Sequence, residues 1–152
     1  MPRRLAVTVS TESVSVSIAK AFEFFIFFIQ SSRSFLFRTV LYLPSFFGDC
    51  SSLDGLSTGG HWNPYDTKHS KWGDPTGFHL GAIGNFEVDS IGHGMLKFKS
   101  DLWCLGCDEE NDILNKAIII HNGADDYVSQ PSGASGMRIG CMEIKIPEEV
   151  SL

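Results

Sequence analysis

The chain has 152 residues, of which 43% are hydrophobic and 20% are charged, and its formal net charge at pH 7 is −6. This length and composition fit one globular domain with its own hydrophobic core. The acidic balance argues against a nucleic-acid partner, which would need a basic face. It does not exclude a small anionic substrate, because a local positive patch can attract an anion to an acidic protein.

Residues 1–47 lack a clear targeting or membrane-spanning signal. Arg3 and Arg4 make the N-terminus basic, but a mixture of Ser, Thr and Val follows instead of an apolar run. Two apolar stretches, 21–29 and 35–47, are interrupted by charged residues or proline. Both are shorter than the ~20 apolar residues that cross a bilayer, so a membrane partner is not expected. The remaining interpretations are a targeting segment, buried core or poorly ordered sequence.

Residues 5–18 predict a pair of short strands. Apolar and hydroxyl side chains alternate on both sides of a Thr-Glu-Ser turn at 11–13, and the apolar positions are Val7, Val9, Val14, Val16 and Ile18. A period of two is typical of β-strands. Residues 21–47 are different, because nine phenylalanines stand among Ser and Arg without a single glycine. This composition does not indicate a β-meander.

From Gly48 onward the character of the chain changes, because all fifteen glycines and all five histidines lie in residues 48–144. Alternating segments at 85–89 and 95–99 flank a Ser-Ile-Gly-His-Gly stretch and predict a hairpin. The apolar run 117–121 suits a buried strand, and 137–146 alternates as a strand does.

Two long segments without strong periodicity separate these strands, at about 49–83 and 122–136. They are rich in Gly, Pro, Asn and Asp, which are turn and loop residues. Loops of this length are uncommon in compact domains and tend to be functional. The two segments are therefore candidates for functional loops.

The four cysteines are Cys50, Cys104, Cys107 and Cys141. An even number suggests disulfides in an oxidising compartment, but four cysteines allow three connectivities. The C-x-x-C motif at 104–107 lacks the βα context of a thioredoxin-like site. A second, local disulfide within this motif is the favoured interpretation, ahead of free thiols and half of a metal site.

The order of short motifs after residue 47 says most about function. They are Gly48-Asp49-Cys50, Gly59-Gly60-His61-Trp62-Asn63-Pro64, His69, His79-Leu80-Gly81, Gly84-Asn85, Ile120-His121 and Arg138-Ile139-Gly140-Cys141. In this order they resemble the metal-binding half of a copper/zinc superoxide dismutase. The resemblance implies an all-β fold, an antiparallel Greek-key β-sandwich or flattened barrel with long metal-site loops.

The resemblance also implies a set of metal ligands. In that family copper is bound by four imidazoles, zinc by three imidazoles and one aspartate, and one histidine binds both metals. His61 matches the shared ligand, His69 and His79 match the other zinc histidines, and His121 matches a copper ligand. Imidazole suits both metals. The fifth histidine, His93, is expected to be a solvated side chain in a turn.

Three supporting roles follow from the same resemblance. Asp125 or Asp126 matches the aspartate whose hydrogen bonds orient ligand histidines of both metal sites. Arg138 matches the catalytic arginine that attracts superoxide, and a fixed guanidinium is a good guide for an anion. Cys50 and Cys141 match the family's disulfide, which would close a loop of about 90 residues.

The sequence departs from the family at three expected ligands. Leu43 and Ser45 stand where the family has two copper-binding histidines, and Pro44 between them would disrupt a central strand. Ala82 stands where the family has the zinc-binding aspartate. Copper would therefore keep only two imidazoles. Zinc would keep three, and three imidazoles with one water make a reasonable zinc site.

The resemblance divides the chain into an unmatched Phe/Ser-rich segment, residues 1–47, and a superoxide dismutase-like domain, residues 48–152. The sandwich is expected to be incomplete, with exposed strand edges, unless residues 1–47 supply substitute strands. The abrupt loss of resemblance has two explanations that the sequence leaves open. One is translated non-coding or frame-shifted sequence, and the other is a genuinely divergent paralogue.

The expected function is that of a superoxide dismutase-like metal-binding protein, with activity impaired by the loss of copper ligands. Intact relatives convert superoxide to oxygen and hydrogen peroxide while copper is alternately reduced and reoxidised. The alternative is a non-enzymatic zinc-binding or interaction module of the same fold. A membrane-anchored protein is a third reading that rests only on the N-terminal phenylalanines. Superoxide would be the substrate, a homodimer is an option, and the compartment would be cytoplasmic or extracellular.

Overall fold

The computed structural model of the chain describes residues 6–10, 13–18, 37–42, 48–88, 94–107 and 109–145. These contain seven strands, namely β1 (Ala6–Ser10), β2 (Ser13–Ile18), β3 (Phe37–Tyr42), β4 (Ala82–Val88), β5 (Gly94–Phe98), β6 (Ala117–His121) and β7 (Arg138–Glu143). A short 3-10 helix, η2 (Leu56–Thr58), lies in the long loop before β4. Within the described ranges, no helix has the length and hydrophobicity of a membrane span.

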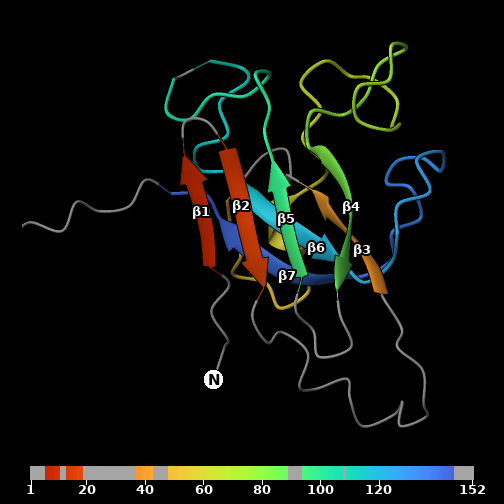
Figure 1. Cartoon of the computed structure of the whole chain (residues 1–152), viewed down its shortest axis with the longest axis horizontal. Helices are drawn as coiled ribbons and strands as arrows, with labels where there is room; N and C mark the ends of the chain where they lie inside the picture. The colour runs from red at the N-terminus through yellow and green to blue at the C-terminus, as the bar shows by residue number, and fades with distance from the viewer. Residues whose placement is uncertain are drawn as a thin grey trace, which may run out of the picture.

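The seven strands form one antiparallel sheet in the order β1-β2-β5-β4-β3-β6-β7. Figure 1 shows β1, β2 and β5 in front of β6 and β7, so that the sheet folds over into two layers. The ends of the sheet, β1 and β7, do not pair with each other in the part of the chain that is described. The expected all-β sandwich is therefore confirmed, and it is open rather than closed.

The core lies between the two layers and is filled mainly by β4, β6 and the segments that flank them. Its buried side chains are Trp62, Leu80, Ile83, Phe86, Val88, Ile113, Ile118, Ile120 and Ile144. Every residue of β6 is buried, as expected for a strand that has a paired neighbour on each side, the second layer over one face and the loop around Gly55 against the other. The apolar run at 117–121 is thus explained by its central place in the sheet.

Two of the predicted strand patterns appear with the expected bounds or close to them. The alternation in residues 5–18 forms the antiparallel β1–β2 hairpin, with Ser10 opposite Ser13. The predicted hairpin after residue 85 forms β4 and β5, which pair through Val88 and Gly94. Its turn, including His93, lies outside the described residues.

Residues 21–47 do not indicate a β-meander, but one segment within them, Phe37–Tyr42, is a strand. This segment forms β3, an interior strand that pairs with β4 on one side and with β6 on the other. Its sequence, Phe-Arg-Thr-Val-Leu-Tyr, is rich in residues that fit a pleated surface. Pairing with two long-range neighbours decides its structure, and the composition of the surrounding segment does not report that pairing.

Two irregularities in strand register position side chains at one end of the sheet. Between β3 and β4 the register shifts at Leu41/Tyr42. Between β6 and β7 it shifts at Ile120/His121, so that His121 lies opposite Arg138 while Ile120 lies opposite Gly140. Such irregularities re-aim side chains and are common beside functional sites.

Two disulfides are present among the described residues. Cys50 is joined to Cys141, with 5.7 Å between their Cα atoms, which ties the start of the long loop to β7. Cys104 is joined to Cys107 within the loop between β5 and β6. The first spans a sequence separation of 91 residues and the second a separation of 3.

Replacing Cys50 and Cys141 together by alanine should lower the free energy of unfolding by about 3–5 kcal/mol, because a disulfide that closes a long loop restricts the unfolded chain most. Chemical denaturation without reductant measures this change. The matched control replaces Cys104 and Cys107 by alanine, which opens only a short loop and should cost much less. A loss in the control as large as in the first variant would contradict the loop-length explanation.

Candidate metal centre

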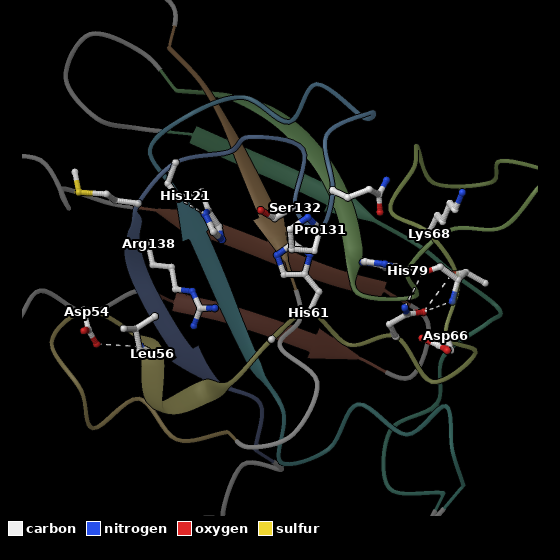
Figure 2. A pocket seen from close by; sticks show the side chains of 16 residues that line it. Asp54, Leu56, His61, Asp66, Lys68, His79, His121, Pro131, Ser132 and Arg138 are labelled. Carbon is white, nitrogen blue, oxygen red and sulfur yellow. Dashed lines mark hydrogen bonds between the residues drawn. The ribbon is translucent and has the colours of Figure 1, made fainter.

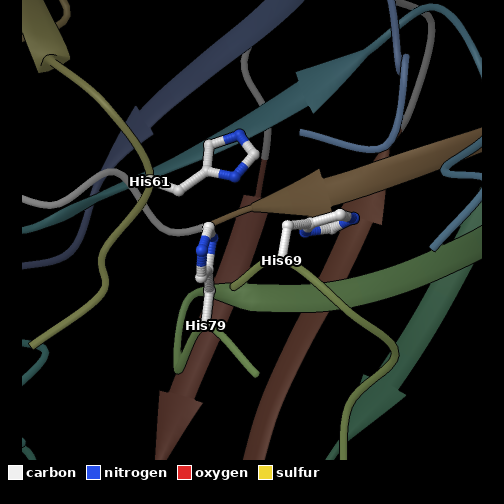
Figure 3. Close-up of side chains that lie close together, drawn as sticks. All are labelled: His61, His69 and His79. Atoms are coloured by element: carbon white, nitrogen blue, oxygen red, sulfur yellow. The ribbon is translucent and has the colours of Figure 1, made fainter. Parts of the chain in front are cut away.

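Three histidines converge where the long loop before β4 meets the sheet. One ring nitrogen from each of His61, His69 and His79 lies within 4.8 Å of the other two. His69 and His79 are buried and His61 is half-buried. Figure 3 shows the three rings turned toward a common point. Three imidazoles in this arrangement are a chemically sound donor set for zinc.

Hydrogen bonds fix the ring nitrogen that carries the proton in two of these histidines. Nε2 of His69 lies 2.8 Å from Oδ1 of Asp125, and Nε2 of His79 lies 3.0 Å from the carbonyl oxygen of Thr67. A carbonyl or carboxylate oxygen only accepts, so Nε2–H must donate in each pair. The lone pair of each neutral ring is then on Nδ1.

Nδ1 of His61, of His69 and of His79 is buried without a hydrogen-bond partner among the described residues. A buried polar nitrogen without a partner is costly, and native structures avoid it unless an ion or water completes the site. In His69 and His79 this atom is the one that the hydrogen bonds through Nε2 leave with a lone pair, and Nδ1 of His61 lies beside them. The donor set therefore fits zinc.

Burial disfavours the charged form of two of the three imidazoles, His61 and His79. It lowers the pKa of His61 to about 3, with repulsion from protonated His121, His79 and His69 as the next causes. Burial also lowers the pKa of His79, despite the hydrogen bond to Thr67 that acts in the opposite direction. Neutral imidazole is the form that binds a metal, so protons compete weakly for these nitrogens at pH 7.

Asp125 connects the cluster to the sheet. Its Oδ1 accepts from Nε2 of His69 at 2.8 Å, and its Oδ2 accepts from the hydroxyl of Tyr42 at 2.6 Å. Burial alone would raise the pKa of this carboxyl, but the hydrogen bonds from His69, Tyr42 and Tyr127 outweigh burial and lower it. Asp125 is therefore an ionised carboxylate shared between two side chains.

The sequence left Asp125 and Asp126 as alternatives for the orienting role, and only Asp125 faces the histidines. The side chain of Asp126 instead accepts from the backbone of Val128 and Ser129 at the surface. The backbone of Asp125 is held by Asn85, which accepts from its N–H at 2.8 Å and donates to its carbonyl at 2.9 Å.

A second contact between the two long loops holds His69 by its backbone. The side-chain amide of Gln130 accepts from the N–H of His69 at 2.8 Å and donates to its carbonyl oxygen at 2.8 Å. This pair of bonds imitates one step of a β-ladder. The segment 122–136 thus positions His69 twice, holding its side chain through Asp125 and its backbone through Gln130.

Arg138 and His121 lie beside this cluster, at the wall of a pocket of about 820 Å³ (Figure 2). The guanidinium of Arg138 donates to the carbonyl oxygens of Gly55 and Gly59 at 2.6 and 2.8 Å. Nδ1 of His121 donates to the carbonyl oxygen of Gly136 at 2.9 Å. Burial lowers the pKa of His121. The arginine is a fixed positive charge that faces the pocket.

Tyr42 is a site residue that the sequence analysis missed. Its fully buried ring stacks on His61, with 3.8 Å between ring centroids and 22° between planes, and lies 5.3 Å from the ring of His121. Burial first, and then the hydrogen bond to Asp125, raise the pKa of its hydroxyl. The sequence offered one signal for this role, a tyrosine at the end of an apolar strand. The hydroxyl of such a tyrosine, when buried, needs a polar partner.

The remaining predicted positions add little to the cluster. Leu43, Pro44 and Ser45 lie outside the described residues. Ala82 is buried in β4 and has no oxygen to offer zinc in its side chain. In the loop before β6, ligand atoms of Cys104, Cys107 and Glu109 lie within 4.8 Å of one another, but the two cysteines are joined in a disulfide.

Comparisons with known proteins agree with this geometry. The model of the copper/zinc superoxide dismutase family matches residues 45–144. The chain is 35% identical over 101 residues to superoxide dismutase [Cu-Zn] 2 of Aquifex aeolicus, a match covering 64% of this chain and 58% of the relative. It is 37% identical over 97 residues to the superoxide dismutase-like protein YojM of Bacillus subtilis, covering 62% and 49%. The chain thus spans about half to three-fifths of the length of these relatives.

A solved structure extends the similarity to the N-terminal strands. A double mutant of a SOD-like protein from Bacillus subtilis superposes with a TM-score of 0.69 and 27% identity, covering 93% of this chain and 88% of that one. The clock protein EA4, at 24% identity and a TM-score of 0.65, shares the fold. With a family model that matches residues 45–144 and a histidine cluster at the expected positions, this chain belongs to the copper/zinc superoxide dismutase family.

Proposed function

We propose that this protein is a superoxide dismutase-like zinc-binding protein whose capacity to disproportionate superoxide is impaired. The observation that carries the proposal is the set of three buried Nδ1 atoms, in His61, His69 and His79, that lack hydrogen-bond partners among the described residues. These residues would hold zinc, and water would take the fourth position that Ala82 leaves without a carboxylate.

The donor set for copper is poorer. Of the expected copper ligands, only His61 and His121 are found among the described residues, with 6.1 Å between their ring centroids. Copper supplies the electron transfer of the family's reaction, and two imidazoles do not hold it in a site that supports both of its oxidation states. The residues present do not fit a working copper centre.

Arg138 is proposed to keep its role toward anions. Its guanidinium is held by Gly55, Thr58 and Gly59, so that its charge stays at the pocket wall. A fixed guanidinium attracts superoxide, and it attracts other small anions equally well. The alternative function, a non-enzymatic zinc-binding or interaction module, is favoured by the same combination of a good zinc donor set and a poor copper donor set.

Replacing His69 by alanine should abolish the binding of one zinc ion per chain, because it removes one of only three protein ligands. Metal analysis of purified protein after dialysis measures this. His93→Ala is the matched control, since it removes an imidazole from a sequence position outside the cluster and should leave zinc content unchanged. Equal zinc content in the His69→Ala variant and the unaltered protein would refute the proposed ligand set.

The purified chain, supplied with zinc and copper, should disproportionate superoxide at only a small fraction of the rate of an intact family member. The physical reason is the loss of two of the four imidazoles that hold copper in intact relatives. A stopped-flow or indicator assay run on both proteins measures the rates. The zinc-only form of the intact relative serves as the background. A rate comparable to that of the intact, copper-loaded relative would overturn the proposal.

Because Gly133 has no side chain, it leaves space for the carboxylate of Asp125, which orients His69. A Cβ placed on Gly133 would lie 1.7 Å from Oδ1 of Asp125 and 2.8 Å from Nε2 of His69. Gly133 also has a φ of +63°, which favours glycine. Any side chain at this position would therefore have to displace the Asp125–His69 hydrogen bond.

Gly133→Ala should weaken zinc binding by about 10- to 100-fold, the usual effect of disturbing a group that orients a metal ligand. Competition with a chromogenic chelator measures the affinity. Gly73→Ala is a matched control, because Gly73 has a φ of +81° but would bring its Cβ within 4 Å of nothing. If both variants weaken zinc binding equally, backbone strain, rather than loss of the Asp125–His69 bond, is responsible.

A further inference from the structure

We propose that Tyr42 restricts this centre to a single metal ion, because its ring occupies the space in which a second ion on His61 would need a third ligand. The inference rests on the proposed zinc binding and adds the residue that determines metal stoichiometry. It concerns the described side chain of Tyr42, whereas the sequence explained the loss of copper by Leu43 and Ser45.

The geometry starts from two histidines that could share an ion. With a metal–nitrogen bond of about 2.0–2.1 Å, an ion lies about 3.2 Å from the centre of an imidazole ring. Two rings whose centroids are 6.1 Å apart, as in His61 and His121, are at the right separation for an ion between them. Two ligands are too few, so a third donor is required.

The third side of that space is lined by carbon. The ring of Tyr42 lies 3.8 Å from the ring of His61 and 5.3 Å from the ring of His121, and the residue has no exposed surface. The three rings thus form a triangle. Among the described residues, the neighbour that an ion between the two imidazoles would have on this side is the aromatic ring of Tyr42, whose carbons offer no lone pair.

The hydroxyl of Tyr42 cannot act as that donor where it stands. It donates a hydrogen bond of 2.6 Å to Oδ2 of Asp125, while Oδ1 of the same carboxylate accepts from His69. The same hydroxyl lies 3.2 Å from the carbonyl oxygen of Ser132, so its proton is held between two acceptors, and a phenol that is donating its proton is a poor metal ligand. Turning it toward an ion would leave Asp125 with a buried, unpaired oxygen.

The backbone also keeps Tyr42 in position. It pairs with Ile119 of β6 on one side and with Ala82 of β4 on the other. The register shift at Leu41/Tyr42 lies directly before it. Pairing on both sides of the strand fixes the backbone of Tyr42, and the hydrogen bond to Asp125 holds the side chain that the backbone carries.

The test is metal stoichiometry, and it uses the full chain. Unaltered protein, Tyr42→His and Tyr42→Phe are loaded with zinc and then with Cu(II), dialysed and analysed for both metals. Tyr42→His supplies an imidazole and should gain one copper ion per chain, with nitrogen hyperfine structure in its EPR spectrum. Tyr42→Phe keeps the aromatic ring but supplies no imidazole. This variant and the unaltered protein should each retain at most about a tenth of the copper that Tyr42→His retains.

A second substitution locates the copper. The copper gained by Tyr42→His should disappear when His121→Ala is added, whereas copper bound in place of zinc at the three-histidine cluster would remain. Zinc is read in the same samples, so an absence of zinc from unaltered protein would refute zinc binding without affecting the copper comparison.

Two results would overturn the role of Tyr42. One is a folded Tyr42→His variant, with an unchanged thermal transition, that gains no copper dependent on His121. The other result needs no variant of Tyr42. If the protein with Tyr42 in place retains one copper ion beside zinc, and the His121→Ala variant loses that copper, the tyrosine does not exclude the second ion.

Discussion

The carboxylate of Asp125 is the contact on which the geometry of the centre depends. One oxygen accepts from His69 in the long loop, and the other accepts from Tyr42 at the end of β3. Both contacts are buried, where an unpaired partner would be costly. Because one carboxylate accepts from two side chains, the positions of His69 and Tyr42 are set together. Disturbing either one leaves the other with a buried group in need of a partner.

The long loop is secured to the sheet at separate places that serve different purposes. Cys50–Cys141 ties its beginning to β7, and Arg138 holds the segment around η2 through Gly55 and Gly59. The arginine thereby gains a fixed orientation while it stabilises the loop. The charge that faces the pocket and the attachment of the loop are therefore two aspects of one set of hydrogen bonds.

Much of the second half could be predicted from the sequence, because its signals are local. The five-residue apolar run at 117–121 became β6, and glycine and histidine motifs marked the residues that converge in the centre. The strand Phe37–Tyr42 was not predicted, because a strand in the interior of a sheet is defined by neighbours distant in sequence. Tyr42 was missed for a related reason: its partner, Asp125, is 83 residues away. The proposed choice between one and two metal ions depends on that single long-range contact.

The two hydrogen bonds between the side chain of Gln130 and the backbone of His69 have a consequence for the order of folding. This contact spans 61 residues, and the bond from Asp125 to His69 spans 56. Closing such long loops costs entropy that must be met before the contact forms, so contacts of this kind appear late. The hydrogen bonds that position His69 are therefore expected to form only after the segment 122–136 has reached the loop before β4. An ion bound by the three histidines would stabilise the native positions of both loops, because it would bind the folded arrangement more tightly than the unfolded chain.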